Sequence, residues 1–193
     1  MSKKNHHPCT RRSFLKTAGS VGLGSLVAAY GQNAAASTKP TVPVDSTATI
    51  PTRPFGKTGE MVPILSLGGM FDIPNNQLLL KQAVKWGVTH WDTANSYGGG
   101  RSEKGIGKYF SRYPEDRKKI FLVTKSGAWT VKGMTDHLEK SLERMQTDYV
   151  DLFFVHGISS IREMDNEKKN WGEKVKSEGK IRYFGFSTHS NME

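Results

Sequence analysis

The sequence predicts an α/β fold in which the strands of one parallel sheet alternate with helices. Short apolar runs alternate with segments of helical periodicity from about residue 51 onwards, and this alternation is typical of βαβ units. The apolar runs are nearly continuous, as expected for strands that are buried on both faces. Polar residues and glycines follow these runs, so they are placed at the carboxyl ends of the predicted strands.

The predicted body begins with a hairpin and a first strand–helix unit. Residues 53–62 hold two short extended pieces around the turn sequence GKTG, which indicates a hairpin. Residues 63–67 form an apolar run that ends in two glycines, as a buried strand does. Leucine, alanine and valine at i,i+4 spacing predict a helix over residues 76–86, and Gly87 stops it.

The rest of the body continues the alternation. The further predicted strands are residues 88–94, 120–124, 149–155 and 180–187. The further predicted helices are residues 102–110, 131–145 and 161–178. Apolar residues mark one face of the helix 131–145. The helix 161–178 is highly charged, and we expect it to be exposed.

Residues 1–36 have the composition of a secretory signal. Basic residues without any acid precede the apolar run 17–31, which is 15 residues long and therefore shorter than the roughly 20 residues that a spanning helix needs. Small residues around Ala36 follow, as at a cleavage site. Arg11 and Arg12, followed by Phe-Leu-Lys, resemble the twin-arginine signal. We therefore expect a periplasmic or other extracytoplasmic protein that uses the twin-arginine export machinery. A basic tail or an uncleaved anchor is the alternative.

Cleavage of this signal would change the net charge and the cysteine content of the chain. The whole chain has 28 Lys and Arg, 18 Asp and Glu and a net charge of +10. Removal of residues 1–36 leaves 23 basic against 18 acidic residues, a net charge of +5, and no basic patch rich in aromatic residues that would indicate nucleic-acid binding. The sequence has one cysteine, Cys9, which excludes a disulfide framework and a cysteine-built metal site within this sequence. Cys9 is removed together with the signal. Residues 37–50 are rich in Ser, Thr and Pro and are predicted to be a flexible linker. No stable membrane span is expected after the signal is cleaved.

Polar residues follow several predicted strands in register. Asp92, Lys125, His156 and Ser187 each stand at the end of a predicted strand. The carboxyl ends of parallel strands meet at one edge, and ionisable residues there are typical of the active site of a β/α barrel. A surface loop position explains any one of these residues equally well, but it does not explain all of them in register.

These residues and their surroundings resemble the aldo-keto reductase family. The matching segments are WDTANSYGGGRSEKGIGKYF, VTKSG, SLERMQTDYVDLFFVH and GKIRYFGFSTH, within roughly residues 52–190. The resemblance implies a (β/α)8 TIM-barrel fold that binds NADP(H) without a Rossmann domain. It implies that residues 51–193 form part of such a barrel, with the hairpin and about five strand–helix units. It also implies the catalytic residues Asp92, Tyr97, Lys125 and His156.

The implied chemistry is the reduction of an aldehyde or ketone to an alcohol. Hydride that arrives at a carbonyl carbon leaves negative charge on the oxygen, so a proton donor must meet that oxygen. In the implied roles, Tyr97 is this general acid, and Lys125 stabilises its phenolate form. Asp92 pairs with Lys125 and keeps it charged, and His156 orients the carbonyl group and assists proton transfer.

The resemblance also implies cofactor contacts. Gly69 and Met70 line the edge of the cofactor, Asp92 contacts it, and Ser187 bonds the nicotinamide carboxamide. Thr188 stands where the family more often has asparagine. Because threonine lacks an amide group, the contact expected at this position stays open.

Four further side chains have a structural as well as a functional interpretation. His90 is expected to pack in the barrel interior rather than to bind a ligand, and His137 is expected to be solvated on a helix turn. His189 is expected to be a loop residue. Trp129 either lines a substrate pocket or packs within its own loop. The histidines are scattered without i,i+4 pairs, so no metal site is expected.

The length raises a question about completeness. Removal of 36 of the 193 residues leaves 157, whereas a β/α barrel has about 250 residues and at least about 200. We therefore expect the sequence to be a fragment of a longer protein, with a decayed half-barrel as the alternative. Two other functions stay open: a subunit that binds the cofactor without turnover, and a redox protein with an iron–sulfur domain in a missing C-terminal part.

Overall fold

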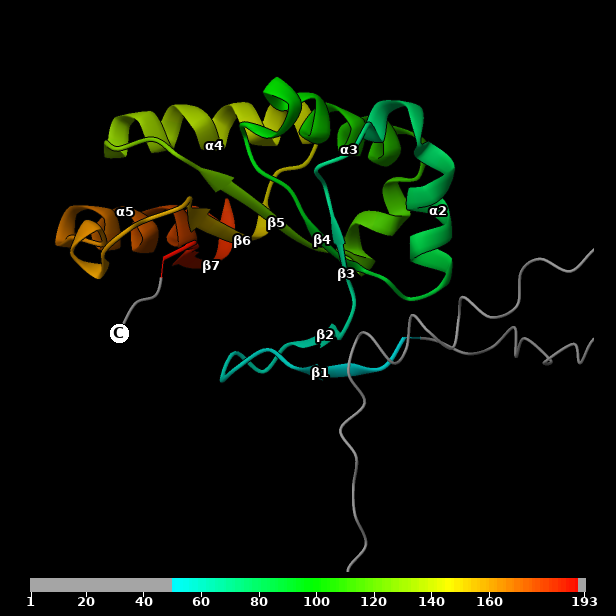
Figure 1. Ribbon diagram of the computed structural model, residues 1–193, viewed down its shortest axis with the longest axis horizontal. Helices are drawn as coiled ribbons and strands as arrows, with labels where there is room; N and C mark the ends of the chain where they lie inside the picture. Colours follow the sequence, from blue (N-terminus) through cyan, green and yellow to red (C-terminus); the bar gives the residue numbers. More distant parts are fainter. Residues whose placement is uncertain (1–49, 191–193) are drawn as a thin grey trace, which may run out of the picture. The chain divides into compact units, whose positions relative to one another are not determined.

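The computed structural model describes residues 50–190 (Figure 1). The strands are β1 (Thr52–Pro54), β2 (Met61–Pro63), β3 (Ser66–Gly68), β4 (His90–Asp92), β5 (Phe121–Ser126), β6 (Val150–Val155) and β7 (Ile181–Phe186). The α-helices are α2 (Gln77–Lys85), α3 (Arg101–Arg112), α4 (Val131–Met145) and α5 (Asn166–Ser177). Short 3-10 turns are η1 (Ile73–Asn75), η2 (Tyr97–Gly100), η3 (Pro114–Lys119) and η4 (Ile161–Glu163). The predicted export signal and residues 37–49 of the predicted linker lie outside the described residues.

The predicted parallel sheet is confirmed. Strands β3 to β7 form one five-stranded sheet in chain order, and each neighbouring pair is parallel. Strands β1 and β2 pair antiparallel as the predicted hairpin. Helices α2, α3, α4 and α5 lie along one side of the sheet, and the hairpin lies on the other side (Figure 1). The chain therefore builds successive βα units of one hand, as expected for parallel connections.

Two apolar cores lie on the two faces of the sheet. The larger core joins the helices to alternate strand residues such as Trp91, Leu122 and Phe153. The smaller core joins the other strand residues, among them Phe121 and Val123, to Val62 of the hairpin. Side chains of successive strand residues point to opposite faces, so the continuous apolar runs supply both cores at once.

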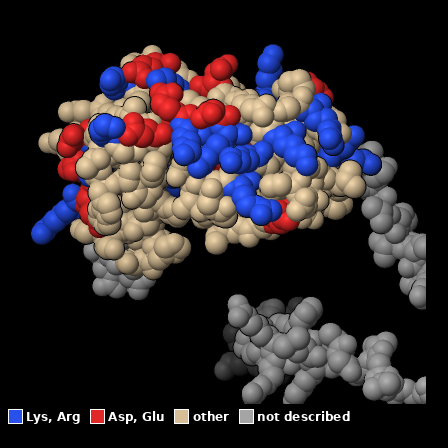
Figure 2. Space-filling model, turned by 90° about the horizontal axis from the view of Figure 1, so that it is seen from above, with Lys and Arg blue, Asp and Glu red and all other residues tan. Residues whose placement is uncertain are grey.

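On the face of the molecule that carries the helices, Lys and Arg side chains gather in a band (Figure 2). On α3, the exposed residues Arg101, Lys104, Lys108 and Arg112 recur at three- and four-residue spacing. This spacing places them on one face of the helix, so the opposite face, which includes Ile106, packs into the core.

A network of ion pairs fixes the hairpin to the sheet near the amino-terminal ends of the strands. Asp151 is 3% exposed, and its Oδ2 lies 3.0 Å from Arg117 Nη2 while its Oδ1 lies 2.7 Å from Arg182 Nη1. Arg182 also pairs with Glu60 at the end of the hairpin turn. Arg182 thus connects the hairpin to the buried carboxylate of β6.

The single helix predicted over residues 161–178 is wrong in two respects. Ser160 and Glu163 form a capping box around the short turn η4, and Asp165 then caps α5 with its side chain, which accepts from Lys168 N. These caps divide the segment. The helix is also not simply exposed, because Trp171 is only 4% exposed and packs against Phe153.

Smaller differences concern the ends of strands. Pro63 pairs within the hairpin rather than in the first parallel strand, and β4 is limited to His90–Asp92 within the predicted strand 88–94. Over residues 50–190, no helix has both the length and the hydrophobicity that crossing a membrane requires.

Candidate active site

The carboxyl ends of β4, β5 and β6 bring the predicted polar residues together. Asp92 is the last residue of β4, Lys125 lies near the end of β5, and His156 follows β6 directly. Tyr97 lies in η2, the turn that follows β4. All four predicted catalytic residues therefore stand at one edge of the sheet.

Lys125 is the centre of this group. Its side chain is 6% exposed, and its Nζ donates to Thr93 O at 2.9 Å and to Tyr97 OH at 3.3 Å. The third partner is the carboxylate of Asp92, whose side chain is 36% exposed. An ammonium group has three protons to donate, so each proton has an acceptor and the side chain is held in one position.

Tyr97 contacts both Lys125 and His156. Lys125 Nζ lies 4.9 Å from the centre of its ring, and the ring of His156 meets it edge-on with centroids 5.9 Å apart. Gly98 and Gly99 follow with φ of 57° and 64°, in the left-handed region that favours glycine. This backbone turns the chain sharply from Tyr97 into α3, and the phenol is left at the edge of the sheet.

His156 is partly buried and is held by a backbone hydrogen bond. The backbone N–H of His156 donates to Ser126 O at 2.9 Å. Burial is the main cause that lowers the pKa of His156, and the charge of Lys125 lowers this pKa further, whereas Asp92 opposes the shift. The imidazole is therefore neutral near pH 7, and a neutral ring keeps one N–H to donate to an oxygen atom.

The predicted cofactor-binding residues have different surroundings. Gly69 N donates to Asp92 O at 2.7 Å, and a Cβ atom at Gly69 would lie 2.8 Å from that oxygen. The close approach of the chain to β4 therefore already requires glycine at this position. Met70 is 79% exposed. Ser187 Oγ accepts from Gly157 N at 3.0 Å, so its own proton stays available for a further acceptor.

Thr188 is turned toward its own loop. Its Oγ1 accepts from Ser190 N at 3.0 Å and donates to Ser190 O at 3.2 Å. Both functions of the hydroxyl are used within its own loop, and threonine has no amide group for the contact that the family's asparagine would make.

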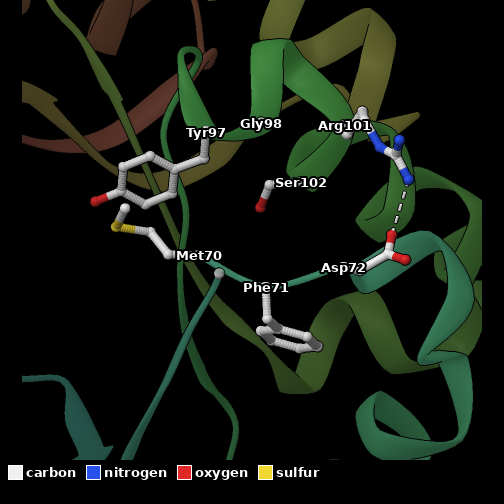
Figure 3. A pocket seen from close by; sticks show the side chains of 8 residues that line it. Met70, Phe71, Asp72, Tyr97, Gly98, Arg101 and Ser102 are labelled. Atoms are coloured by element: carbon white, nitrogen blue, oxygen red, sulfur yellow. Dashed lines mark hydrogen bonds and ion pairs between the residues drawn. The ribbon is translucent and has the colours of Figure 1, made fainter.

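Two cavities adjoin Tyr97. The larger, of about 480 Å³, extends from Met70 and Tyr97 at one end to Asp72 and Arg101 at the other (Figure 3). Arg101 Nη2 lies 3.0 Å from Asp72 Oδ1, and this ion pair joins the loop after β3 to the start of α3. The second cavity, of about 290 Å³, is lined by Asp92 as well as by Met70 and Tyr97. Met70 and Tyr97 thus line both cavities.

A third cavity lies beside His156. It measures about 100 Å³ and is lined by Trp129, Ile158 and Lys168 among others. Of the two interpretations of Trp129, the structure favours the one that places it at a pocket, because its side chain is 79% exposed and is not packed within its own loop.

The other histidines occupy separate positions. His90 packs edge-on against Phe121 with ring centroids 5.4 Å apart. The expectation that His137 is solvated is wrong, because its Nδ1 lies 2.8 Å from Ser126 Oγ. His189 is exposed in the loop after β7. Among residues 50–190, no group of three or more His, Cys, Asp or Glu side chains is arranged to hold a metal ion.

Sequence reasoning missed a buried pair behind the Tyr97 loop. Glu103 is completely buried and pairs with Arg144 at 3.0 Å. A local signal exists, because Glu103 shares a helix face with Ile106 and Phe110 at i,i+3 and i+7. An acid on the apolar face of a predicted helix indicates a buried partner.

We expect the free energy of unfolding to decrease as the pH falls below about 6.5. The pKa of His90, like that of His156, is lowered mainly by burial; for His90 the charge of Arg53 adds to the effect and Asp92 opposes it. In this pH range the unfolded chain therefore binds more protons than the folded chain, and stability must rise with pH.

Urea unfolding between about pH 5 and 8 measures this dependence. His90→Phe is expected to flatten the slope, because it removes one of the two histidines whose pKa is lowered by burial. Constant or increasing stability on acidification through this range would contradict the expectation.

The family profile and the similar proteins described below point to the same family. The profile described as "Aldo/keto reductase family" matches residues 66–193. The aldo-keto reductase yakc of Schizosaccharomyces pombe, whose name includes NADP(+), is 35% identical over 159 residues, which are 72% of this chain and 45% of that protein. L-glyceraldehyde 3-phosphate reductase of Escherichia coli is 30% identical over 154 residues, 70% of this chain and 44% of that protein. The chain thus spans about half the length of the curated relatives that it matches.

The solved structures agree with this result. The holo form of aldo-keto reductase AKR11C1 from Bacillus halodurans superposes with a TM-score of 0.66 at 28% sequence identity. The match covers 72% of this chain and 51% of that structure. The parallel βα units of the described residues therefore correspond to part of a (β/α)8 barrel, as predicted.

Proposed function

The chain belongs to the aldo/keto reductase family, and from this premise we propose that the protein is an NADP(H)-dependent oxidoreductase that reduces an aldehyde or ketone to the alcohol. The observation that carries the proposal is the contact of Tyr97 OH with a buried lysine at 3.3 Å, beside two cavities. A phenol held against a fixed ammonium group has the partners that a general acid requires.

In the proposed reaction, Tyr97 moves the proton. Its OH accepts a hydrogen bond from Lys125 and retains its own proton, which it donates to the carbonyl oxygen of the substrate as negative charge develops there. The phenolate oxygen that remains then faces the ammonium group of Lys125. Because the side chain of Lys125 is almost completely buried, this attraction is stronger than it would be in water.

His156 is proposed to orient the substrate. Its pKa is lowered, so its ring is neutral and donates one hydrogen bond without adding a charge near Lys125. The T-shaped contact with Tyr97 places both side chains at the same edge of the sheet. A carbonyl oxygen that meets both donors is held in one orientation, which reduces the entropy cost of the reaction.

The residues present fit the cofactor in part. NADPH, when bound, supplies the hydride that the carbonyl carbon accepts. Ser187 has a free proton for a carboxamide oxygen, and Asp92 is exposed enough for its second oxygen to accept from a sugar hydroxyl. Gly69 and Met70 border both cavities at Tyr97. Thr188 is not assigned a contact, because its hydroxyl is engaged by Ser190. The name of the relative from Schizosaccharomyces pombe supports NADP(H) over NAD(H).

The test separates turnover from binding. Oxidation of NADPH is followed by absorbance with a series of small aldehydes and ketones, and NADPH binding is measured in parallel by fluorescence. We expect oxidation of NADPH that requires the carbonyl compound and is faster than with NADH. Binding of NADPH without turnover of any carbonyl compound would contradict the proposal and would favour a cofactor-binding subunit.

A further inference from the structure

A buried ion pair lies behind the loop that carries Tyr97. Glu103 belongs to the first turn of α3 and Arg144 to the last turn of α4. The side chain of Glu103 is completely buried and that of Arg144 is 13% exposed, and Arg144 Nη1 lies 3.0 Å from Glu103 Oε2. In the described part of the chain, neither residue lines the cavities at Tyr97. The pair therefore does not meet a ligand in those cavities.

Glu103 is connected to the strand that carries Lys125. Its Oε1 accepts from Thr124 Oγ1 at 2.8 Å, so both carboxylate oxygens have partners. Thr124 directly precedes Lys125 in β5, and successive strand residues point to opposite faces. Glu103 thus holds β5 from the helical side at the point where Lys125 reaches the site on the other side.

Arg144 is connected to the loop that carries Tyr97. Its Nη1 also donates to Asn95 O at 3.1 Å, and Asn95 N donates to Lys125 O at 3.0 Å. The loop passes directly over the guanidinium group, because a Cβ atom at Gly100 would overlap it. Gly100 has a φ of 90°, so both its backbone conformation and the space around it require glycine.

These hydrogen bonds hold the two segments that carry Tyr97 and Lys125. Glu103 is hydrogen-bonded to β5, which carries Lys125, and Arg144 is hydrogen-bonded to the loop that carries Tyr97. Burying an ion pair costs the hydration free energy of both charges, and their mutual attraction often does no more than offset this cost. An apolar pair of similar volume is therefore often as stable. Stability alone therefore does not explain an ion pair here, whereas the directional hydrogen bonds do define one placement of the loop.

We propose that Glu103 and Arg144 are positioning residues that set the place of Tyr97 OH relative to Lys125 Nζ. For its kinetic consequences the proposal rests on the proposed function, but the placement itself is a property of the loop and of β5. Because the pair does not line the cavities, its loss should lower kcat and leave the affinity for the cofactor nearly unchanged.

The kinetic test uses Glu103→Gln, Arg144→Lys and Arg144→Gln in the full chain, with Asp151→Asn as the matched control. Asp151 is also buried and paired with an arginine at 3.0 Å, but this pair lies near the amino-terminal ends of the strands. Misplacement by about 1 Å can cost roughly 100-fold in rate. We expect kcat to fall about 10- to 100-fold in Glu103→Gln and Arg144→Gln, less in Arg144→Lys, which retains the charge, and not in Asp151→Asn.

Amide hydrogen exchange tests the placement without turnover. The amide of Asn95 donates to Lys125 O and that of Tyr97 donates to Ala94 O. We expect both to exchange about tenfold faster in Glu103→Gln and Arg144→Gln, and at the original rate in Asp151→Asn.

The outcomes are distinct for the two proposals. Exchange rates that stay at the original value in all variants would overturn the positioning role, as would an equal loss of kcat in Asp151→Asn. If the unmodified protein reduces no carbonyl compound, the proposed function fails, and the exchange rates still decide the positioning role.

Discussion

Replacement of Tyr97 by phenylalanine is expected to lower kcat for carbonyl reduction by about 10²- to 10⁴-fold, the usual contribution of a positioned general acid. Phenylalanine keeps the ring and its edge-on contact with His156 but removes the proton that the carbonyl oxygen must receive. It also removes an acceptor of Lys125, which retains Thr93 O and Asp92 as partners. The fold and the affinity for NADPH should therefore change little.

A second tyrosine provides a matched control. Tyr113 OH accepts from Lys81 Nζ at 3.3 Å, the same distance as in the contact between Tyr97 and Lys125, but it lies at the end of α3. Tyr113→Phe should retain full activity. Steady-state kinetics and NADPH binding measure both variants. Unchanged turnover in Tyr97→Phe would exclude Tyr97 as the general acid.

The central strands of the sheet could be predicted from the sequence because β5 and β6 are buried on both faces. In β5 and β6 the apolar run identifies the strand without any knowledge of its neighbours, and Lys125 and His156 mark where the strands end. Parallel pairing then places these ends at one edge. The grouping of Lys125 with His156 thus follows from local patterns and one topological rule.

The features that could not be predicted depend on contacts between segments distant in sequence. Glu103 and Arg144 are 41 residues apart, and only the packing of α3 on α4 brings them together. His137 is predicted to be solvated from its helix position, but Ser126 in β5 reaches it. The break in residues 161–178 before α5 does not depend on distant contacts. Asp165 caps α5 with its side chain, which is a local signal, but the high charge of the segment obscures it.

Replacement of Lys125 by methionine is expected to lower kcat by about 10²- to 10³-fold, as loss of one donor to a developing negative charge does in other enzymes. Methionine has a similar length and fills the buried site, but it donates no hydrogen bond to Tyr97 OH or Thr93 O. The phenolate that forms when Tyr97 gives up its proton then has no adjacent ammonium group. Proton donation becomes less favourable as the reaction proceeds, so the loss falls on the chemical step.

The effect on stability should be smaller than the effect on rate. Asp92, the partner left behind, has a side chain that is 36% exposed, so water replaces the lost ammonium in part, and the cost is expected to be about 1–3 kcal/mol. Lys132→Met is the matched control, because Lys132 also pairs with an aspartate, at 2.8 Å, but its side chain is 85% exposed. Such surface pairs contribute about 0–1 kcal/mol, so this variant should keep both its stability and its activity. Urea unfolding and kinetics on both variants measure the difference, and a folded Lys125→Met variant with its original kcat would show that Tyr97 acts without the lysine.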